Sequence, residues 1–231
     1  MLKKEKFKKL EKETFDIRKK SIEMAVRAET GHLGPALSIV DILWILYSRV
    51  MNYDPKNPEW SERDRLIISK GHGCIALYVT LAKAGFFDEN ILKTFCNRFD
   101  TSLGGHPERR LPGVEANTGS LGHGFNIGIG MAIAAKTDNL NYKVYSILGD
   151  GENQEGTIWE GAMAAAHNKL DNLVAIVDRN RLQVSDFVNN VMDIEPLKDK
   201  WASFGWGVKV VDGHDLNKLD EVFNSVPFKK G

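Results

Sequence analysis

Asp150 and Asn180 are the residues whose types and spacing most clearly suggest chemistry. Asp150 follows the apolar run 144–148 within a Gly-Asp-Gly sequence, and Asn180 follows the next apolar run, 173–177. If the two runs are neighbouring parallel strands joined by a helical crossover, both side chains reach the same edge of the sheet. One carboxylate and one amide oxygen suit Mg²⁺ or Ca²⁺ that is bound mainly to a phosphate. The spacing therefore predicts a divalent-metal site at this edge.

The glycines on either side of Asp150 favour a phosphate ligand. Gly149 and Gly151 carry no side chain, so backbone amides can approach a diphosphate closely. A Gly-Asp-Gly turn alone is common and is weak evidence for a metal site. Asn180 at the matching end of the next strand makes the evidence stronger. The glycine-rich stretch 119–130 lacks the G-x-G-x-x-G spacing of a dinucleotide-binding loop, and the chain has no Walker A sequence.

The histidines have a common context. Five of the six directly follow a glycine: His32, His72, His106, His123 and His214. A preceding glycine permits a tight turn that aims the imidazole into a cleft, where several imidazoles could bind a polar substrate and transfer protons near neutral pH. A turn or capping role is the alternative for any one of them. Zinc binding is disfavoured because no pair of histidines has the spacing of zinc ligands.

The elements that must position these residues alternate between strand and helix. We expect buried strands at 144–148, 173–177 and 208–211, with helices at 157–170 and 216–225. This order predicts an α/β fold, a three-layer α/β/α sandwich with a mostly parallel sheet. We expect a single domain over residues 1–231, whose end suggests a truncation or an unusual sheet edge.

Helical periodicity is also present in the first half of the chain. A seam of residues at helical spacing predicts a long first helix packed on the body of the protein: Phe7, Leu10, Thr14, Ile17, Ser21, Met24 and Ala28. A nucleic-acid arm or a membrane-surface helix is disfavoured because acidic residues are mixed with the basic ones. Further helices are expected at 38–50, 74–84 and 122–136, the last with a face of small residues that lets a neighbour approach closely.

The composition excludes several classes of protein. Hydrophobic residues make up 42% of the chain and charged residues 27%, which is typical of a globular protein and not of a disordered one. Lys plus Arg and Asp plus Glu both number 31, so a nucleic-acid partner is disfavoured. The two cysteines, Cys74 and Cys96, fit a reducing compartment. We see no signal peptide or membrane span and expect a cytoplasmic protein without a membrane partner.

Six motifs occur in an order that identifies a family. They are GHLGPALS (31–38), RDRLIISKGHG (63–73), GGHPE (104–108), PGVEANTGSLGHG (112–124), GDGENQEGTIWEG (149–161) and DRNRLQ (178–183). From about residue 15 to its end, the chain resembles the N-terminal, diphosphate-binding half of transketolase. It is most similar to the split transketolases, whose two halves are separate polypeptides.

This resemblance implies a cofactor, thiamine diphosphate, and a metal. Asp150, Asn180 and the backbone carbonyl of Leu182 would hold Mg²⁺ or Ca²⁺ on the diphosphate. The resemblance assigns further cofactor contacts to Gly151, His72, Asn180 and Glu155, and places the aminopyrimidine ring against Gly119, Ser120 and Leu121.

The resemblance also implies catalytic and interface residues. His32, His72 and His106 would line the substrate channel. Glu155, counted among the catalytic residues, and Glu160 would lie where two copies of the chain associate, in a carboxylate network that links paired active sites. The alternative for both glutamates is a solvated helix start, where acidic side chains suit the helix dipole.

The chain departs from the family pattern in three respects. Ser120 stands where many full-length members have proline, and Arg181 stands where the general signature often has a second asparagine. The chain also stops before a segment that carries another active-site histidine, and it lacks the pyrimidine-binding half, which holds the cofactor-activating glutamate and most sugar-phosphate-binding residues. The resemblance therefore implies a C-terminal partner subunit, an α2β2 assembly, and no activity without the partner.

The activity implied is transfer of a two-carbon ketol unit from a ketose phosphate to an aldose phosphate, as in the pentose phosphate pathway. Two alternatives stay open. One is a subunit of another thiamine-diphosphate enzyme, similar to deoxyxylulose-phosphate synthase or to a 2-oxo acid dehydrogenase, although the three histidine motifs argue against the dehydrogenase. The other is a non-catalytic thiamine-diphosphate-binding subunit.

Overall fold

The computed structural model describes residues 2–97, 103–184 and 186–228. The chain divides into two compact units. The segments of unit 1 are Met1–Trp60, His72–Asn117 and Val211–Asn224. The segments of unit 2 are Ser61–Gly71, Thr118–Val210 and Ser225–Gly231. Among the described helices, none combines the length and the apolar character needed to cross a bilayer.

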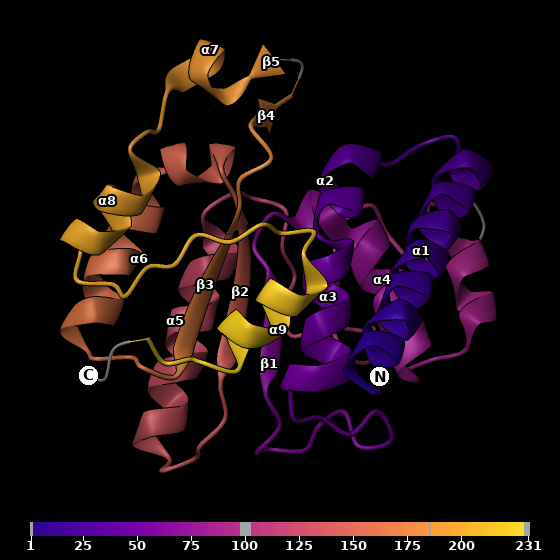
Figure 1. The fold of residues 1–231 in the computed structure, drawn as a ribbon, viewed down its shortest axis with the longest axis horizontal. Helices are drawn as coiled ribbons and strands as arrows, with labels where there is room; N and C mark the ends of the chain where they lie inside the picture. The colour runs from indigo at the N-terminus through magenta and orange to yellow at the C-terminus, as the bar shows by residue number, and fades with distance from the viewer. Residues whose placement is uncertain (1, 98–102, 185, 229–231) are drawn as a thin grey trace. The chain divides into compact units, whose positions relative to one another are not determined.

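The helices and strands, labelled in Figure 1, alternate along the second half of the chain. The α-helices are α1 (Leu2–Ala28), α2 (Leu33–Ser38), α3 (Val40–Ile45), α4 (Cys74–Ala84), α5 (His123–Thr137), α6 (Gly156–His167), α7 (Val188–Met192), α8 (Leu197–Ser203) and α9 (Leu216–Phe223). The shorter helical turns are a π-helical turn at Leu46–Val50 and 3₁₀ turns at Gly71–Gly73, Glu89–Thr94 and Gly151–Gln154. The strands are β1 (Arg65–Ile68), β2 (Val144–Gly149), β3 (Leu173–Asp178), β4 (Leu182–Gln183) and β5 (Asp186–Phe187).

Unit 2 is built on a parallel sheet with the strand order β1-β2-β3 (Figure 1). All but the last residue of β2 are buried, which explains its continuous apolar run, because a parallel strand is covered on both faces. In the register between β2 and β3, Gly149 lies opposite Asp178, so the two strands end side by side. The predicted α/β class, with a parallel sheet and neighbouring strands at 144–148 and 173–177, is confirmed.

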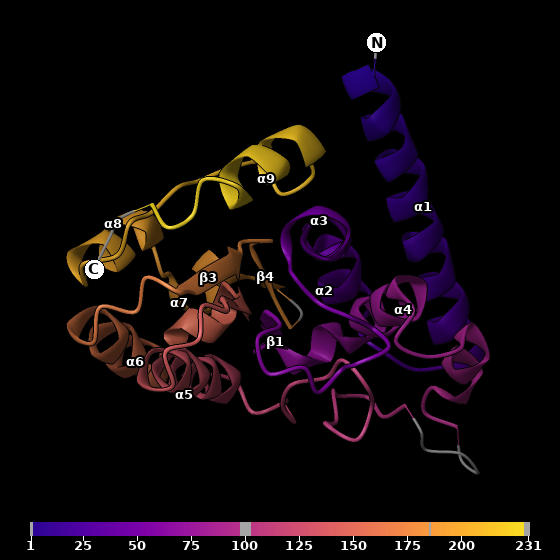
Figure 2. The same cartoon turned by 90° about the horizontal axis from the view of Figure 1, so that it is seen from below.

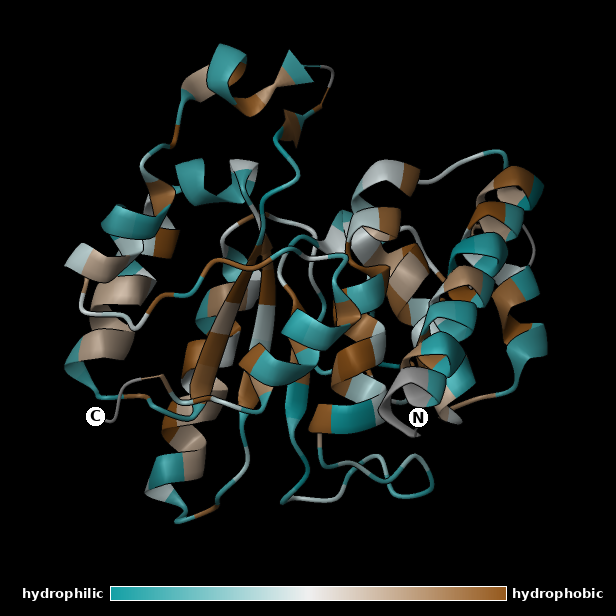
Figure 3. Cartoon of the chain, in the orientation of Figure 1, coloured by the Kyte–Doolittle hydropathy of each residue, from teal (hydrophilic) through white to brown (hydrophobic). Residues whose placement is uncertain are grey.

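Helix α5 packs on this sheet, and α6 packs against α5 (Figure 2). Gly124 makes the close approach possible, since a Cβ there would lie 2.6 Å from Cα of Ser69. The core of unit 2 continues into aromatic side chains. The ring of Phe125 lies 5.7 Å from that of Trp201, which in turn lies 4.9 Å from that of Trp206. In Figure 3, β3 carries mostly hydrophobic colour.

Unit 1 is helical, and the predicted seam of α1 is its buried face. From Phe7 to Met24 every residue of the seam is buried, whereas Ala28 is only partly so. Figure 3 shows the alternation of hydrophobic and hydrophilic residues along α1 that this arrangement requires. The helix expected at 38–50 forms as well, although it is interrupted at Ile39 and ends in the π-helical turn.

Two expectations about strands differ from the structure. The prediction of a strand at 208–211 was wrong, because this segment is not hydrogen-bonded into the described sheet. Val210 is 74% exposed, so apolar residues alone did not make a strand without a backbone partner. Conversely, β1 was not predicted, because its four residues are too short to show a pattern of their own.

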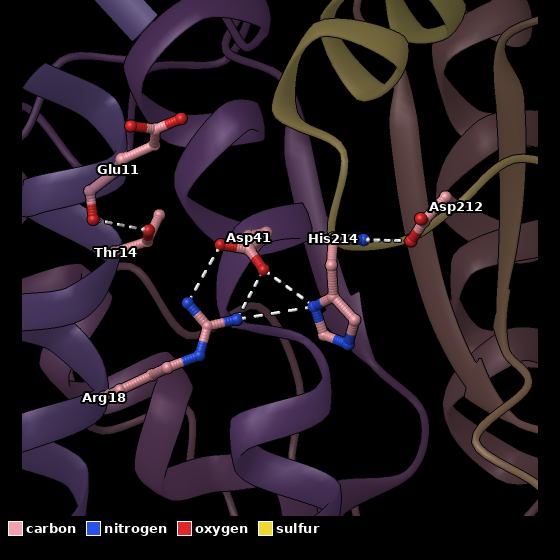
Figure 4. Close-up of polar contacts among 6 residues, drawn as sticks. All are labelled: Glu11, Thr14, Arg18, Asp41, Asp212 and His214. Atoms are coloured by element: carbon pink, nitrogen blue, oxygen red, sulfur yellow. Dashed lines mark hydrogen bonds and ion pairs between the residues drawn. The ribbon is translucent and has the colours of Figure 1, made fainter. Parts of the chain in front are cut away.

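A buried carboxylate holds together three segments of unit 1 (Figure 4). Asp41 on α3 accepts two hydrogen bonds from the guanidinium of Arg18 on α1. Nδ1 of His214, in the turn before α9, lies 2.8 Å from Oδ2 of the same carboxylate. This cluster therefore ties the segment 211–224 to α1 and α3.

Replacing Asp41 with asparagine is expected to destabilise the protein by about 3 kcal/mol near neutral pH, because Arg18 would lose its charged partner. Burial, the largest influence, raises the pKa of Asp41, but Arg18 and His214 together lower it below its usual value of 3.8. The stabilisation is therefore fully present above that value and is lost as the pH falls below it. Urea unfolding of both proteins at several pH values measures the difference.

The exposed ion pair between Lys20 and Glu89 provides the control, because Glu89→Gln should lower the free energy of unfolding by less than about 1 kcal/mol. A difference between wild type and Asp41→Asn that does not shrink in acid would contradict this role of Asp41.

Candidate functional site

Unit 2 places a buried ion pair where its strands end. Lys70, two residues beyond β1, donates a 2.6 Å hydrogen bond to Oδ2 of Asp178 at the end of β3. The two side chains are only 1% and 8% exposed. Charged groups that are this buried must be paired, so the end of the sheet is a region where charge is concentrated and held in place.

Asp150, the predicted metal ligand, lies beside this pair at the end of β2. Its carboxylate accepts hydrogen bonds from the backbone N–H groups of Gly151, at 2.9 Å, and Arg181, at 2.6 Å. Burial raises the pKa of this carboxyl above its ordinary value, and the two backbone hydrogen bonds only partly offset that effect. No basic side chain of the described residues lies within ion-pair distance of Asp150. The carboxylate is therefore short of positive charge.

Asn180 and Leu182 follow β3 in the turn that faces Asp150. The backbone N–H of Asp150 donates to the carbonyl of Asp178, and Asn180 Nδ2 donates to the carboxylate of that residue. Asn180 Oδ1 accepts from the N–H of Leu182 at 2.9 Å. Thus Asp150 and Asn180 follow adjoining strands, and the N–H of Arg181, next to Asn180, binds the carboxylate of Asp150. The described residues contain no cluster of three or more His, Cys, Asp or Glu side chains able to hold a metal, so other oxygen ligands would be needed.

This donor set fits a hard divalent cation on a phosphate. One carboxylate with amide and carbonyl oxygens leaves most coordination positions for ligand or water, which is typical of Mg²⁺. The buried charge of Asp150, which its hydrogen bonds offset only in part, is the observation that favours a cation here. The hydroxyl of Thr118, which is buried without a hydrogen-bond partner among the described residues, indicates that a polar ligand is also missing nearby in unit 2.

Gly71 is required by a close backbone contact, and Gly151 lies against a neighbouring side chain. A Cβ on Gly71 would lie 2.8 Å from the backbone nitrogen of Gly119 and from the carbonyl carbon of Thr118. A Cβ on Gly151 would lie 3.2 Å from Cδ of Gln183, so there too a side chain would crowd its neighbour. The loop that contains Gly119, Ser120 and Leu121 therefore begins tightly against the end of the β1 segment.

Glu152, which sequence reasoning missed, anchors the far end of that loop. Its carboxylate accepts hydrogen bonds from Ser69 Oγ, from the N–H of Gly122 at 2.8 Å and from the N–H of Gly149 at 3.0 Å. Burial raises the pKa of Glu152, and these hydrogen bonds oppose that effect. Lys70 and Asp178 were missed as well. The available signal was a charged residue within two positions of the end of a buried apolar run.

Unit 1 carries the three histidines predicted for catalysis. The rings of His32 and His72 lie 5.7 Å apart in an edge-to-face arrangement, so the structure brings these two together. Gly31, before the first of them, has a φ of +121° and would place a Cβ 2.6 Å from Ile75 Cδ1. Only glycine fits this conformation and this contact, which is the tight turn expected of the Gly-His sequence.

His106 lies in a loop held by α4 of the same unit. The hydroxyl of Tyr78 bridges the carbonyl oxygens of Gly104, at 3.0 Å, and His106, at 2.7 Å. Cys74 donates from its thiol to the carbonyl of Gly105 at 3.1 Å. Burial raises the pKa of Cys74 to about 12, so this thiol acts as a neutral donor and not as a nucleophile. The loop is thus fixed through its backbone, which leaves the exposed imidazole available.

The remaining candidates lie on the surface or in structural contacts. His123 begins α5, with its ring near the carbonyl of Leu121, and His214 binds Asp41, so not every Gly-His pair serves one site. Glu155 and Glu160 are both exposed at the start of α6, and Ser120 is exposed in its loop. These positions are compatible with the expected interface and cofactor roles and do not test them.

Comparison with known proteins gives the family. Residues 11–230 match the family model described as "Transketolase, thiamine diphosphate binding domain". The chain is 45% identical over 211 residues to an apulose-4-phosphate transketolase subunit of Phocaeicola vulgatus, covering 91% of this chain and 75% of that protein. It is 46% identical over 204 residues to the 6-deoxy-6-sulfo-D-fructose transketolase subunit of a Clostridium species, covering 88% of this chain and 74% of that protein.

The solved structures that resemble this chain also belong to transketolases. The crystal structure of transketolase from Campylobacter jejuni superposes with a TM-score of 0.88 at 33% identity and covers 94% of this chain, whereas this chain covers 35% of that one. The chain therefore spans about three quarters of the subunit relatives and about a third of that solved transketolase chain. These findings confirm the resemblance drawn from the six motifs. The chain belongs to the transketolase family, as its N-terminal, thiamine-diphosphate-binding half.

Proposed function

We propose that this chain is the thiamine-diphosphate-binding subunit of a two-component transketolase that works in the cytoplasm. With a separate C-terminal subunit it would transfer a two-carbon ketol unit from a ketose to an aldose phosphate. The observation that carries the proposal is the buried carboxylate of Asp150, beside Asn180 and short of positive charge, in a chain of this family.

Thiamine diphosphate, when bound, supplies the carbon nucleophile that carries the ketol unit. The chain's own residues bind and orient it. Asp150, Asn180 and the carbonyl of Leu182 hold Mg²⁺ or Ca²⁺ against the diphosphate, and the backbone at Gly151 approaches the same group. The loop of Gly119, Ser120 and Leu121 contacts the aminopyrimidine ring. The tight contact of Gly71 with Thr118 and Gly119 supports a fixed position for this loop.

His32, His72 and His106 are proposed to bind the substrate and move protons at its hydroxyl and carbonyl oxygens, with His72 also contacting the diphosphate. Two observations support this role, because proton transfer requires donors in fixed positions. The rings of His32 and His72 contact each other, and the hydroxyl of Tyr78 binds the backbone carbonyl of His106. Glu155 and Glu160 are proposed to meet a second copy of the chain, and their exposure at the start of α6 leaves them available for it.

The proposed partner is a C-terminal subunit with the pyrimidine-binding half, in an α2β2 assembly. Support comes from the names of the relatives at 45% and 46% identity, which are both transketolase subunits. Those names also specify ketoses that carry a phosphate or a sulfo group. We therefore propose a donor ketose with an anionic group, a phosphate in the first instance.

Asp150→Ala is expected to abolish Mg²⁺-dependent binding of thiamine diphosphate, because it removes the only charged ligand of the metal. Asn180→Ala should weaken binding by roughly tenfold, since water can replace a neutral oxygen. Titration calorimetry on the chain assembled with a C-terminal subunit, with and without Mg²⁺, measures both. Asp171→Asn, a surface carboxylate of unit 2 paired with Lys136, is the matched control and should bind normally. Normal affinity in Asp150→Ala would refute the metal assignment.

Alanine at His32, His72 or His106 is expected to lower turnover of the assembled enzyme by about 10² to 10⁴, because each change removes a positioned hydrogen-bonding or acid–base group. The His72 variant should also bind the cofactor less tightly. Thermal midpoints should change little, since two of the three imidazoles are exposed and the third is half-buried. Normal activity together with sharply lower midpoints would show that these histidines are structural.

The isolated chain is expected to show no ketol transfer with saturating thiamine diphosphate and Mg²⁺. Adding a C-terminal transketolase subunit should give turnover on the order of 10 s⁻¹. The reason is that the carboxylic acid that activates the cofactor is expected on the partner. A stopped-time assay with a ketose phosphate donor and an aldose phosphate acceptor measures the rate. Turnover at that level by the partner-free chain would overturn the proposal.

A further inference from the structure

Glu152 is a buried carboxylate that the proposed function does not use. It is 2% exposed, and its two oxygens accept from three donors that belong to three segments of unit 2. Ser69 follows β1, Gly149 ends β2, and Gly122 precedes α5. A buried carboxylate is costly to desolvate, and hydrophobic packing would join these segments at less cost. The arrangement is therefore explained better by a need for exact position than by a need for stability.

The hydrogen bonds extend from Glu152 into α5. Ser69 Oγ donates to Glu152 and accepts at 2.9 Å from the N–H of Phe125, in the first turn of the helix. Gly122, at the N-terminal end of the same helix, has a φ of +81°, a conformation that favours glycine. Its N–H points to Glu152 in that conformation, which fixes the chain direction at the end of the loop 119–121.

The same loop is fixed at its start by the contact of Gly71 with Thr118 and Gly119. Both ends of the loop are thus attached to segments that follow β1 and β2, and at the second end the N–H of Gly122 is held by the carboxylate of Glu152. Asp150 lies two residues before Glu152 on the same turn, so the metal ligand and the anchor of the loop share one short piece of backbone.

We propose that Glu152 is a positioning residue that sets the loop Gly119–Ser120–Leu121 against the cofactor's aminopyrimidine ring while Asp150 holds the metal. This inference rests on the proposed function and adds a residue to it. Glu152 touches neither cofactor nor substrate and acts through the backbone of the loop.

The test compares two ligands of the chain assembled with a C-terminal transketolase subunit, by calorimetry in excess Mg²⁺: thiamine diphosphate and inorganic pyrophosphate. Pyrophosphate reports on the metal and diphosphate contacts alone, whereas thiamine diphosphate also engages the loop. In Glu152→Gln, one oxygen becomes an NH₂ group that faces an N–H or O–H donor, so one hydrogen bond is lost without a change in shape. We expect roughly tenfold weaker binding of thiamine diphosphate and less than about twofold weaker binding of pyrophosphate.

Ser69→Ala keeps the carboxylate of Glu152 and removes one of its donors, so it should change the ratio of the two affinities in the same direction. This variant provides the test if Glu152→Gln does not fold. Hydrogen exchange at the amides of Gly122 and Phe125 should be faster in both variants and unchanged in the control, Asp171→Asn. The inference would be overturned if the variants left the ratio of the two affinities unchanged. It would also be overturned if the wild type bound thiamine diphosphate and pyrophosphate with equal affinity. Failure of the assembled wild-type protein to bind either ligand in the presence of Mg²⁺ would instead refute the proposed function.

Discussion

Negative charge is concentrated at one edge of a small parallel sheet, and this constraint explains most of the surrounding structure. Asp150, Glu152 and Asp178 are all buried there, and Lys70 is the one buried basic side chain among the described residues. It pairs with Asp178, which leaves two carboxylates to be satisfied by other means. Backbone N–H groups supply part of the compensation. A divalent cation would supply the rest and would at the same time bind a diphosphate.

The dependence on backbone donors accounts for the glycines. Three of the N–H groups that bind these carboxylates belong to Gly122, Gly149 and Gly151. A fourth glycine, Gly71, lets the loop at Thr118 lie against the segment after β1. A Cβ at Gly122 would lie 2.4 Å from Cγ2 of Thr157, and one at Gly71 would lie 2.8 Å from the backbone nitrogen of Gly119, so a side chain at either position would force the chain to shift. Parallel strands make the arrangement possible, because their carboxyl ends meet at one edge although the residues are far apart in sequence.

The sequence predicted those parts of the fold that depend on local pattern. Two neighbouring strands, the helix between them and the seam of α1 follow from apolar periodicity, and the contact between Asp150 and the turn of Asn180 follows from the length of the crossover. Local pattern could not show whether the segment 208–211 forms a strand, because a strand needs a hydrogen-bonding partner from another part of the chain. Glu152 was missed for a similar reason. Its role depends on donors 83 and 30 residues away, at Ser69 and Gly122. His214 follows a glycine as His32 does, yet it binds Asp41, and the sequence alone does not separate the two cases.

The central claim is that the ends of β2 and β3 hold a divalent cation on a diphosphate. Paramagnetic relaxation by Mn²⁺ in place of Mg²⁺ tests it most directly. Mn²⁺ added with thiamine diphosphate should broaden the phosphorus signals of the cofactor together with the amide signals of Gly151, Arg181 and Leu182, and Asp150→Ala should remove the broadening of those amides. Phosphorus broadening without effect on these amides, or broadening centred on another part of the chain, would contradict the account.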